Sequence, residues 1–324
     1  MEKVRIGIIG GAQIAGKYML PSLAALRTEY KINGVASRNH EKANEIAQRY
    51  DALPFNNYEE LVNSDLIDAI YIPLPNSLHH EWILKSLENG KHVLVEKSLT
   101  CSLTETLEVM NKAREKKLVV MENFQFRFHS QLKFILDLIN NNEIGQLRNI
   151  RSSFGFPPFN DSNNIRYQKE LGGGALLDAG AYPVKISQYF LGEDIKVKSS
   201  KLYYDEKLGV DLWGGAFLTS RNSGLFSEIA FGFDNFYQCN LELWGSKGKI
   251  TTERIFTAPP GFKPTLIIEK PGGKVVKELP ADNNFINMLK YFHKLIIENN
   301  YEEEFRQNIS QSKLLEEIRN KNYE

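Results

Sequence analysis

Short apolar runs alternate with amphipathic stretches at helical spacing through the first 123 residues. The runs predict strands at residues 4–9, 31–36, 69–73, 91–95 and 118–122. After the third and fourth of these runs, residues 81–89 and 103–116 predict helices that bury one face. Strands that alternate with helices form a parallel sheet covered on both sides. We therefore expect a doubly wound α/β domain over residues 1–123.

From residue 147 onward the pattern changes to extended runs, separated by turn signals such as the Asn-Ser-Gly of residues 222–224. The runs occupy residues 147–156, 210–219, 224–233, 238–244, 248–253 and 265–269. They predict one antiparallel sheet, and helical patterns return at 285–298 and 309–319. We expect residues 124–324 to form a second domain that binds substrate and makes the oligomer contacts.

The run 227–233 carries apolar residues on both faces of a strand. One face has to pack on helices, and the other is expected to pack on a second subunit. A sheet buried within a monomer explains the same pattern. We expect a homodimer or homotetramer formed through this sheet.

Composition excludes several classes of partner. A length of 324 residues exceeds one ordinary core and agrees with two domains. Lys plus Arg and Asp plus Glu number 40 each, so the chain as a whole has no attraction for nucleic acid or for an anionic membrane. No apolar run approaches the roughly 20 residues of a membrane span, and no leader precedes the first strand, so we expect a cytoplasmic protein. Cys101 and Cys239 have no His or Cys neighbours at metal-ligand spacing, and no metal is expected.

A phosphate-binding turn is predicted directly after the first strand. The segment GGAQIA (residues 10–15) gives the order of strand, tight turn and helix that holds a dinucleotide pyrophosphate. The first fingerprint glycine is Gly10, whereas the second position holds Ala12, whose methyl group lies where the backbone should approach the phosphate. We expect Gly10, Ala12, Gln13 and Ile14 to contact the cofactor. A purely structural glycine turn is the alternative.

The second predicted strand ends in Ser37 and Arg38, where an enzyme that prefers NAD usually carries an acidic residue for the ribose 2′-hydroxyl. A hydroxyl followed by a guanidinium suits a 2′-phosphate instead. We therefore expect these two residues to bind NADP(H) in preference, with NAD(H) possible. The alternative makes Arg38 a solvated loop residue.

The segment GGGALLDAGAYP (residues 172–183) carries the most informative candidate groups. If it is helical, Asp178 and Tyr182 lie four residues apart on one face. Pro183 predicts a kink or a new helix start just after the phenol. The alternative is a buried helix in which Asp178 is a capping acid and Tyr182 a core aromatic.

Charged and aromatic residues elsewhere are candidate partners for this segment. Glu96 and Lys97 follow the run 91–95, at the edge where open parallel sheets bind ligands. Arg166 and Tyr167 precede the glycines on a polar loop. We expect Arg166 to bind a diphosphate and Tyr167 to stack on a sugar or form a hydrogen bond with it. Both are therefore candidate substrate-binding residues.

Five segments, in this order, resemble the Gfo/Idh/MocA family of nicotinamide-dependent oxidoreductases over essentially the whole chain. They are GIIGGAQIA, IPLPNSLHHEW, VEKSLT, NFQFRFHSQ and GGGALLDAGAYP. The resemblance implies a Rossmann domain followed by an α/β domain whose large, mostly antiparallel sheet commonly builds a dimer or tetramer. It also implies that Lys97 meets the segment of Asp178 and Tyr182 over the nicotinamide. The further cofactor contacts that it implies are Leu74, Asn76, His79 and Glu96.

Many relatives have His where Tyr182 stands. Tyrosine there, with NNIRYQKELGGG and LWGSKGKITTERIFTAPP, is most similar to the nucleotide-sugar ketoreductase branch, of the dTDP-3-keto-6-deoxyhexose type. That branch also accepts Ala at the fingerprint position of Ala12. Relatives usually carry Glu-Lys-Pro, whereas this chain has Ser98 after Lys97. Either Ser98 reproduces the turn by side-chain bonding, or Lys97 is less accurately placed.

These residues suit the reduction of a ketone. Hydride transfer to a carbonyl carbon makes its oxygen negative, and Tyr182 is the expected proton donor. Free tyrosine has a pKa of about 10, and the ammonium group of Lys97 would favour its ionised form. Asp178 is expected to orient Lys97 or a sugar hydroxyl.

We therefore expect an NADP-dependent reductase of a keto-sugar, and in particular of a nucleotide-linked sugar. One alternative is a dehydrogenase of a free sugar, polyol or dihydrodiol on the same fold. Another, from a different class, is a non-catalytic dinucleotide-binding sensor or co-repressor. The sensor predicts loss of Lys97 or Tyr182, and both are present.

Overall fold

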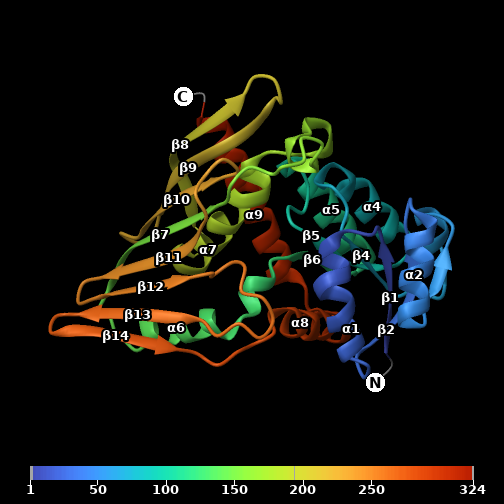
Figure 1. Ribbon diagram of the computed structural model, residues 1–324, viewed down its shortest axis with the longest axis horizontal. Coiled ribbons are helices and arrows are strands. Elements are labelled where there is room, and N and C mark those ends of the chain that lie inside the picture. The colour runs from blue at the N-terminus through green and yellow to red at the C-terminus, as the bar shows by residue number, and fades with distance from the viewer. Residues whose placement is uncertain (1–2, 193, 323–324) are drawn as a thin grey trace. The chain divides into compact units, whose positions relative to one another are not determined.

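The computed structural model describes residues 3–192 and 194–322, which divide into two compact units (Figure 1). The first unit contains the described residues through Asn123 together with Phe285–Ile309. The second contains Phe124–Asn284 and the residues from Ser310 onward. Each unit is built on one β-sheet.

The segment 285–309 packs with the first unit, whereas the sequence analysis assigned it to the second domain. The ring of Phe285 stacks on Tyr18 with 4.9 Å between centroids. The hydroxyl of Tyr30 donates to the carbonyl of Leu289 at 2.8 Å, and Phe305 joins the buried core around the parallel sheet. Its apolar side chains therefore find their partners on the first unit, although the chain reaches this segment only after the second sheet.

The first unit contains a six-stranded parallel sheet with the order β3-β2-β1-β4-β5-β6, which confirms the predicted doubly wound fold. The strands are β1 Val4–Ile9, β2 Tyr30–Ala36, β3 Leu53–Phe55, β4 Ala69–Ile72, β5 His92–Glu96 and β6 Val120–Asn123. The helices are α1 Leu20–Ala25, α2 His40–Tyr50, α3 Tyr58–Val62, α4 Asn76–Glu88, α5 Leu103–Lys116, most of α8 Asn284–Glu298 and the first part of α9 Glu302–Lys321. Because the strands are parallel, their carboxyl ends meet at one edge, where such sheets bind ligands.

The second unit contains an eight-stranded sheet with the order β14-β13-β12-β11-β7-β10-β9-β8. Neighbours run antiparallel except β7 and β10, which pair in parallel, so the predicted mostly antiparallel sheet is confirmed. The strands are β7 Leu147–Gly155, β8 Ile195–Asp205, β9 Val210–Ser220, β10 Phe226–Gly232, β11 Gln238–Gly245, β12 Lys249–Glu253, β13 Thr265–Lys270 and β14 Gly273–Glu278. The helices of eight residues or more that lie within this unit are α6 Ser130–Asn140 and α7 Ala181–Leu191.

One face of the second sheet is buried and the other is open. Along β10, Ile229 and Phe231 are buried, whereas Glu228 and Ala230, which alternate with them, are half-buried and exposed. α7 packs on the buried side against β7 and β10. The open side carries ion pairs, such as Arg151 with Glu228 at 2.6 Å.

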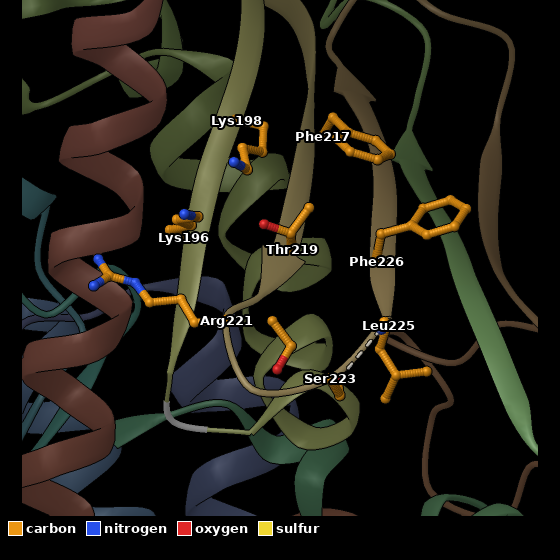
Figure 2. A pocket seen from close by; sticks show the side chains of 10 residues that line it. Lys196, Lys198, Phe217, Thr219, Arg221, Ser223, Leu225 and Phe226 are labelled. Atoms are coloured by element: carbon orange, nitrogen blue, oxygen red, sulfur yellow. Dashed lines mark hydrogen bonds between the residues drawn. The ribbon is translucent and has the colours of Figure 1, made fainter.

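A shallow basin of about 420 Å³ lies on the open side, over β8, β9 and β10 (Figure 2). Phe217 and Phe226 line one part of it, and Lys196, Lys198 and Arg221 line another. The neighbouring Lys198 lowers the pKa of Lys196, first through a side-chain hydrogen bond and then through the repulsion between the two charges. The basin is therefore a concentration of positive charge on the open face.

The sequence analysis missed β8 and β14, both at edges of the second sheet. Edge strands carry charged residues that prevent further strand pairing, and these weaken the apolar pattern. The outward amides of β8 are also satisfied by side chains near the end of α9. Val197 donates to the Glu317 carboxylate at 3.0 Å, and Leu202 donates to Oδ1 of Asn322 at 2.6 Å. A helix thus protects this edge.

Acid is expected to destabilise the first unit, because two of its histidines are held neutral by burial. Burial lowers the pKa of His79 and of His92 to about 4, below the value of about 6.5 in an unfolded chain. Between these values the unfolded chain binds more protons than the folded one. The free energy of unfolding therefore falls as the pH falls through this window.

His92→Asn isolates one of these contributions. Nδ1 of His92 accepts the Val119 amide at 3.0 Å, and an asparagine oxygen can replace that acceptor without titrating. Lowering the pH from 7 to 5 should cost the variant about 2 kcal/mol less stability than the wild type. Urea unfolding at the two pH values measures this difference, and removal of the exposed His40 by His40→Asn is the control. The same loss in H92N and wild type would contradict the assignment.

Candidate active site

The turn after β1 requires glycine at its first position. Gly10 has a φ of +108°, and its amide donates to the carbonyl of Ala36 at 2.8 Å. A Cβ at this position would lie 2.8 Å from Cδ2 of Leu74. The turn therefore passes tightly against Leu74, which brings two of the expected cofactor residues together.

The chain becomes helical at Gln13, directly after this turn. The carbonyl of Ala12 accepts the amides of Ala15 and Gly16 at 3.1 and 3.4 Å. Ala12, Gln13 and Ile14 thus form the start of a helix that follows a strand, which is the arrangement that binds phosphate. Their cofactor contacts remain predictions.

Two cations flank the same region. Lys42, in the first turn of α2, donates its Nζ to the carbonyl of Gly11. Arg38 is exposed at the end of β2 and interacts with the phenol of Tyr58; burial raises the pKa of Tyr58, and Arg38 partly offsets this. Ser37 is buried, and its Oγ accepts the amide of the second residue after it at 3.2 Å. Arg38 and Lys42 therefore place positive charge beside the turn. Neither Ser37 nor Arg38, the two residues expected to bind the 2′-phosphate, carries a carboxylate.

Glu96 ends β5 in a desolvated, hydrogen-bonded position. Its Oε1 accepts the hydroxyl of Tyr71 at 2.6 Å and Nδ2 of Asn123 at 2.7 Å. Burial raises the pKa of Glu96, and these two donors partly hold it down. The carboxyl end of β5, from which Lys97 follows, is therefore fixed by its neighbouring strands.

The turn after Lys97 is held through its main chain. The peptide bond between Lys97 and Ser98 is cis. The amide of Ser98 donates to Oδ1 of Asn76 at 3.2 Å, and the amide of Leu99 donates to Oε1 of Glu122 at 2.8 Å. Proline has no N–H, so the bond to Asn76 is one that the usual Glu-Lys-Pro sequence cannot make.

His79, on α4, is fully buried between two loops at this edge. Its Nδ1 lies 2.7 Å from the carbonyl oxygen of Ser98, and its Nε2 lies 2.8 Å from that of Leu74. Both ring nitrogens thus face protein groups. The contact between His79 and the cofactor stays a prediction.

In the second unit, the glycine run anchors the polar loop that precedes it. The amides of Gly173 and Gly174 donate to the carbonyls of Gln168 and Arg166 at 3.0 and 2.9 Å. These bonds fix the short helical turn Ile165–Tyr167, which carries the two expected substrate residues.

Asp211, on β9, caps the helix that follows the glycines. Its carboxylate accepts the amide of Leu176 at 2.6 Å. A Cβ on Gly174, whose φ is +111°, would lie 2.4 Å from Oδ1 of Asp211, so a glycine is needed there. Burial raises the pKa of Asp211 to about 6. Asp178 is therefore not required as the capping acid.

Asp178 pairs instead with Arg166, whose Nε donates to Oδ2 at 2.6 Å. The carboxylate raises the pKa of Arg166, and the guanidinium also lies 4.9 Å from the ring centroid of Phe159. The phenol oxygen of Tyr167 accepts the amide of Phe159 at 3.0 Å. The structure thus gathers Arg166, Tyr167 and Asp178, three of the expected residues, around one loop.

The ring of Tyr182 is 8% exposed and lies in a box of four phenylalanines. Its centroid lies 5.5, 5.9, 5.2 and 5.6 Å from those of Phe124, Phe126, Phe154 and Phe256. The contacts with Phe124 and Phe154 are edge-to-face and the other two are tilted, and together they fix the direction of the ring. The Coulomb interaction between Tyr182 and Arg166 also raises the pKa of Arg166, so the phenol lies within electrostatic reach of the ion pair.

A π-helical turn, Leu176–Gly180, leads into α7. The sequence analysis expected an irregularity just after Tyr182, whereas this turn lies before it. Pro183 has no N–H to bond the preceding turn, and a widened turn there accommodates the loss. Asp178 and Tyr182 therefore do not follow regular α-helical spacing.

Sequence reasoning missed Lys42, Asp211 and Lys185. Lys185 is fully buried on α7, with its ammonium 5.4 Å from the ring centroid of Phe124. Helical spacing could have indicated Lys185, three residues after Tyr182, but not Lys42, because Arg38 lies before the start of α2. Asp211 gave no such signal, because it comes from a strand distant in sequence.

Within residues 3–192 and 194–322, no three His, Cys, Asp or Glu side chains are grouped so that they could hold a metal ion. No helix in the same ranges is long and apolar enough to cross a membrane.

Known proteins resemble both units. Residues 4–124 match the family model described as oxidoreductase family, NAD-binding Rossmann fold, and residues 133–251 match the GFO/IDH/MocA C-terminal domain. The chain is 39% identical to a dTDP-3,4-didehydro-2,6-dideoxy-alpha-D-glucose 3-reductase of Streptomyces violaceoruber, over 87% of the chain and 82% of the relative. It is 35% identical to the reductase of the same name from Actinomadura kijaniata, over 98% and 95%. A 3-ketoreductase from Actinomadura kijaniata, solved with NADP and TDP-benzene, matches with a TM-score of 0.94 and 34% identity, over 99% of this chain and 98% of that one.

Proposed function

We propose that the chain, which belongs to the Gfo/Idh/MocA family of NAD(P)-dependent oxidoreductases, uses NADPH to reduce the keto group of a nucleotide-linked sugar. The observation that carries the proposal is the similarity to 3-reductases of dTDP-linked sugars, at 39% and 35% identity over 87% and 98% of the chain. The similar structure solved with NADP and TDP-benzene supports both ligand classes. Lys97, Asp178 and Tyr182, the residues expected to carry the chemistry, are all present.

The residues of the first unit fit a dinucleotide that carries a 2′-phosphate. Gly10 leaves the turn free of a side chain, and the helix that begins at Gln13 offers amides to a pyrophosphate. We assign the 2′-phosphate to Arg38 and Lys42, since guanidinium and ammonium groups make charge-assisted hydrogen bonds to phosphate. When bound, the nicotinamide supplies the hydride.

In this proposal Tyr182 donates the proton to the keto oxygen, and the ammonium group of Lys97 assists it by favouring the ionised form of the phenol. Asp178 by itself would oppose the negative charge that grows on the keto oxygen. Its ion pair with Arg166, at 2.6 Å, supports a role as an orienting group whose own charge is compensated.

We assign the nucleotide to the loop around Phe159. Nε of Arg166 bonds Asp178, so its terminal amino groups are the ones we assign to a diphosphate. The Tyr167 oxygen accepts a main-chain amide, which leaves its hydroxyl hydrogen for a sugar oxygen.

We also propose that a second copy of the chain covers the open face of the second sheet. Tyr203, Trp213 and Trp244 on this face are 47%, 37% and 52% exposed. The basic basin at β8 and the carboxylates of Glu228 and Glu242 on the central strands give the face complementary charges.

The oligomer is tested by gel filtration with light scattering. A dimer or tetramer of the 37.1 kDa chain is expected. Trp244→Glu should dissociate it, because it places a charge in the contact. Val275→Glu is the control, since β14 is exposed along its whole length at the edge of the sheet. A monomer at micromolar concentration would contradict the proposal.

Cofactor choice is tested by fluorescence titration. NADPH should bind more tightly than NADH, and Arg38→Ala should weaken NADPH binding by roughly 10- to 100-fold, as loss of a charge-assisted hydrogen bond does. Arg49→Ala, which removes an exposed cation from the last turn of α2, is the control. Equal affinities in the wild type would contradict the NADPH assignment. Binding of neither cofactor would make Ala12 an obstruction and contradict the proposed function.

Turnover is tested with a dTDP-linked 3-keto sugar and NADPH. Tyr182→Phe and Lys97→Ala should each lower kcat by about 10² to 10⁴, the usual contribution of a positioned acid. Tyr189→Phe, which removes another phenol of α7, is the matched control. Arg166→Ala should weaken the binding of dTDP itself, which has no keto group. Faster turnover of a free sugar than of the nucleotide-linked sugar would favour the dehydrogenase alternative.

A further inference from the structure

His79 joins two loops that serve different parts of the proposed site. The loop at Leu74 lies against the Gly10 turn, whereas Ser98 belongs to the turn that directly follows Lys97. The imidazole spans them, with Nε2 at 2.8 Å from the Leu74 oxygen and Nδ1 at 2.7 Å from the Ser98 oxygen. The side chain of His79 therefore links the loop that is expected to bind the cofactor to the turn that follows Lys97.

Only one of the two contacts can be a hydrogen bond at neutral pH. Carbonyl oxygens only accept, and a neutral imidazole carries one N–H. Burial keeps the ring neutral, since it lowers the pKa of His79 to about 4. The shorter of the two contacts, at 2.7 Å, is the one between Nδ1 and the Ser98 oxygen. The proton is therefore better placed on Nδ1, which faces the turn after Lys97.

We propose that His79 is a positioning residue whose Nδ1–H holds the Ser98 carbonyl and so directs Lys97 for the reduction step. The inference rests on the proposed function, because it takes the role of Lys97 from there. Asn76 and Glu122 hold the amides of Ser98 and Leu99, and His79 adds the carbonyl bond. Together these side chains hold a turn that the proline of relatives would stiffen.

Two substitutions separate the ring nitrogens. In His79→Asn the amide nitrogen occupies the place of Nδ1, and in His79→Gln it occupies the place of Nε2. The first variant keeps a donor for Ser98, and the second keeps a donor for Leu74. A residue that only filled space would not distinguish them in this direction, because glutamine is closer to histidine in size.

H79Q should lower kcat about 10- to 100-fold with little change in NADPH affinity, because a small displacement of a catalytic group costs this much. H79N should keep kcat within about threefold of the wild type and leave NADPH affinity unchanged, because its amide nitrogen still donates to the Ser98 carbonyl. His92→Asn removes a half-buried histidine from the amino end of β5 and should change neither parameter. Equal loss of kcat in H79N and H79Q, or unchanged kcat in H79Q, would overturn the inference.

A readout without turnover separates this inference from the proposed function. After reductive methylation with carbon-13 formaldehyde, the Lys97 signal is assigned by its absence in Lys97→Arg. That signal should shift in H79Q and stay in place in H79N. If it does so while the wild type reduces no keto-sugar, the proposed reaction fails and the positioning of Lys97 stands. If it shifts equally in both variants, the positioning role fails whatever the reaction.

Discussion

Main-chain polar groups at the ends of the parallel strands impose the constraint on which the candidate site depends. Where β5 ends, the ladder of sheet hydrogen bonds stops, yet Ser98 and Leu99 in the loop beyond it are buried. A buried group without a partner costs about 1–3 kcal/mol. Asn76, His79 and Glu122 supply the partners, each through one bond to the loop main chain. These residues are thus fixed by the need to satisfy the backbone as well as by any ligand.

The second unit meets the same constraint with Asp211. This carboxylate, on β9, accepts the amide of Leu176. Burial disfavours its charged form and raises its pKa to about 6. Because the cap comes from outside the segment, Asp178 is available to pair with Arg166. If Asp178 capped the helix itself, its carboxylate would not be available to Arg166. The cap that Asp211 supplies therefore allows the ion pair to form.

The sequence predicts best the features that follow from local patterns. β1 and α5 have the predicted bounds. A run of β-branched residues is typical of a strand, and an amphipathic stretch is typical of a helix. β8 was missed, because an edge strand covered by α9 does not need an apolar pattern on both sides. The contacts of the segment 285–309 with the first unit could not be predicted from local patterns, because its aromatic partners lie at the beginning of the chain.

Within the site, types of residue were predictable and their partners were not. The motifs pointed to Asp178, Tyr182 and Lys97, but the bond between Arg166 and Asp178 depends on a loop that the glycine amides hold in place. The burial of His79 depends on two loops that are more than 20 residues apart in sequence. Contacts of this kind arise from packing, and periodicity carries no information about them.

The pairing of Arg166 with Asp178 bears directly on the proposed reaction. A carboxylate beside a carbonyl opposes the charge that hydride transfer creates, whereas a neutral ion pair leaves that charge to the proton donor and to nearby cations. The pair is shielded, with side chains 34% and 16% exposed, so water screens it only in part. The second unit therefore holds a phenol fixed in direction by aromatic rings and a carboxylate already neutralised. In the proposed reaction, the hydride and any further compensating charge have to come from groups outside this ion pair.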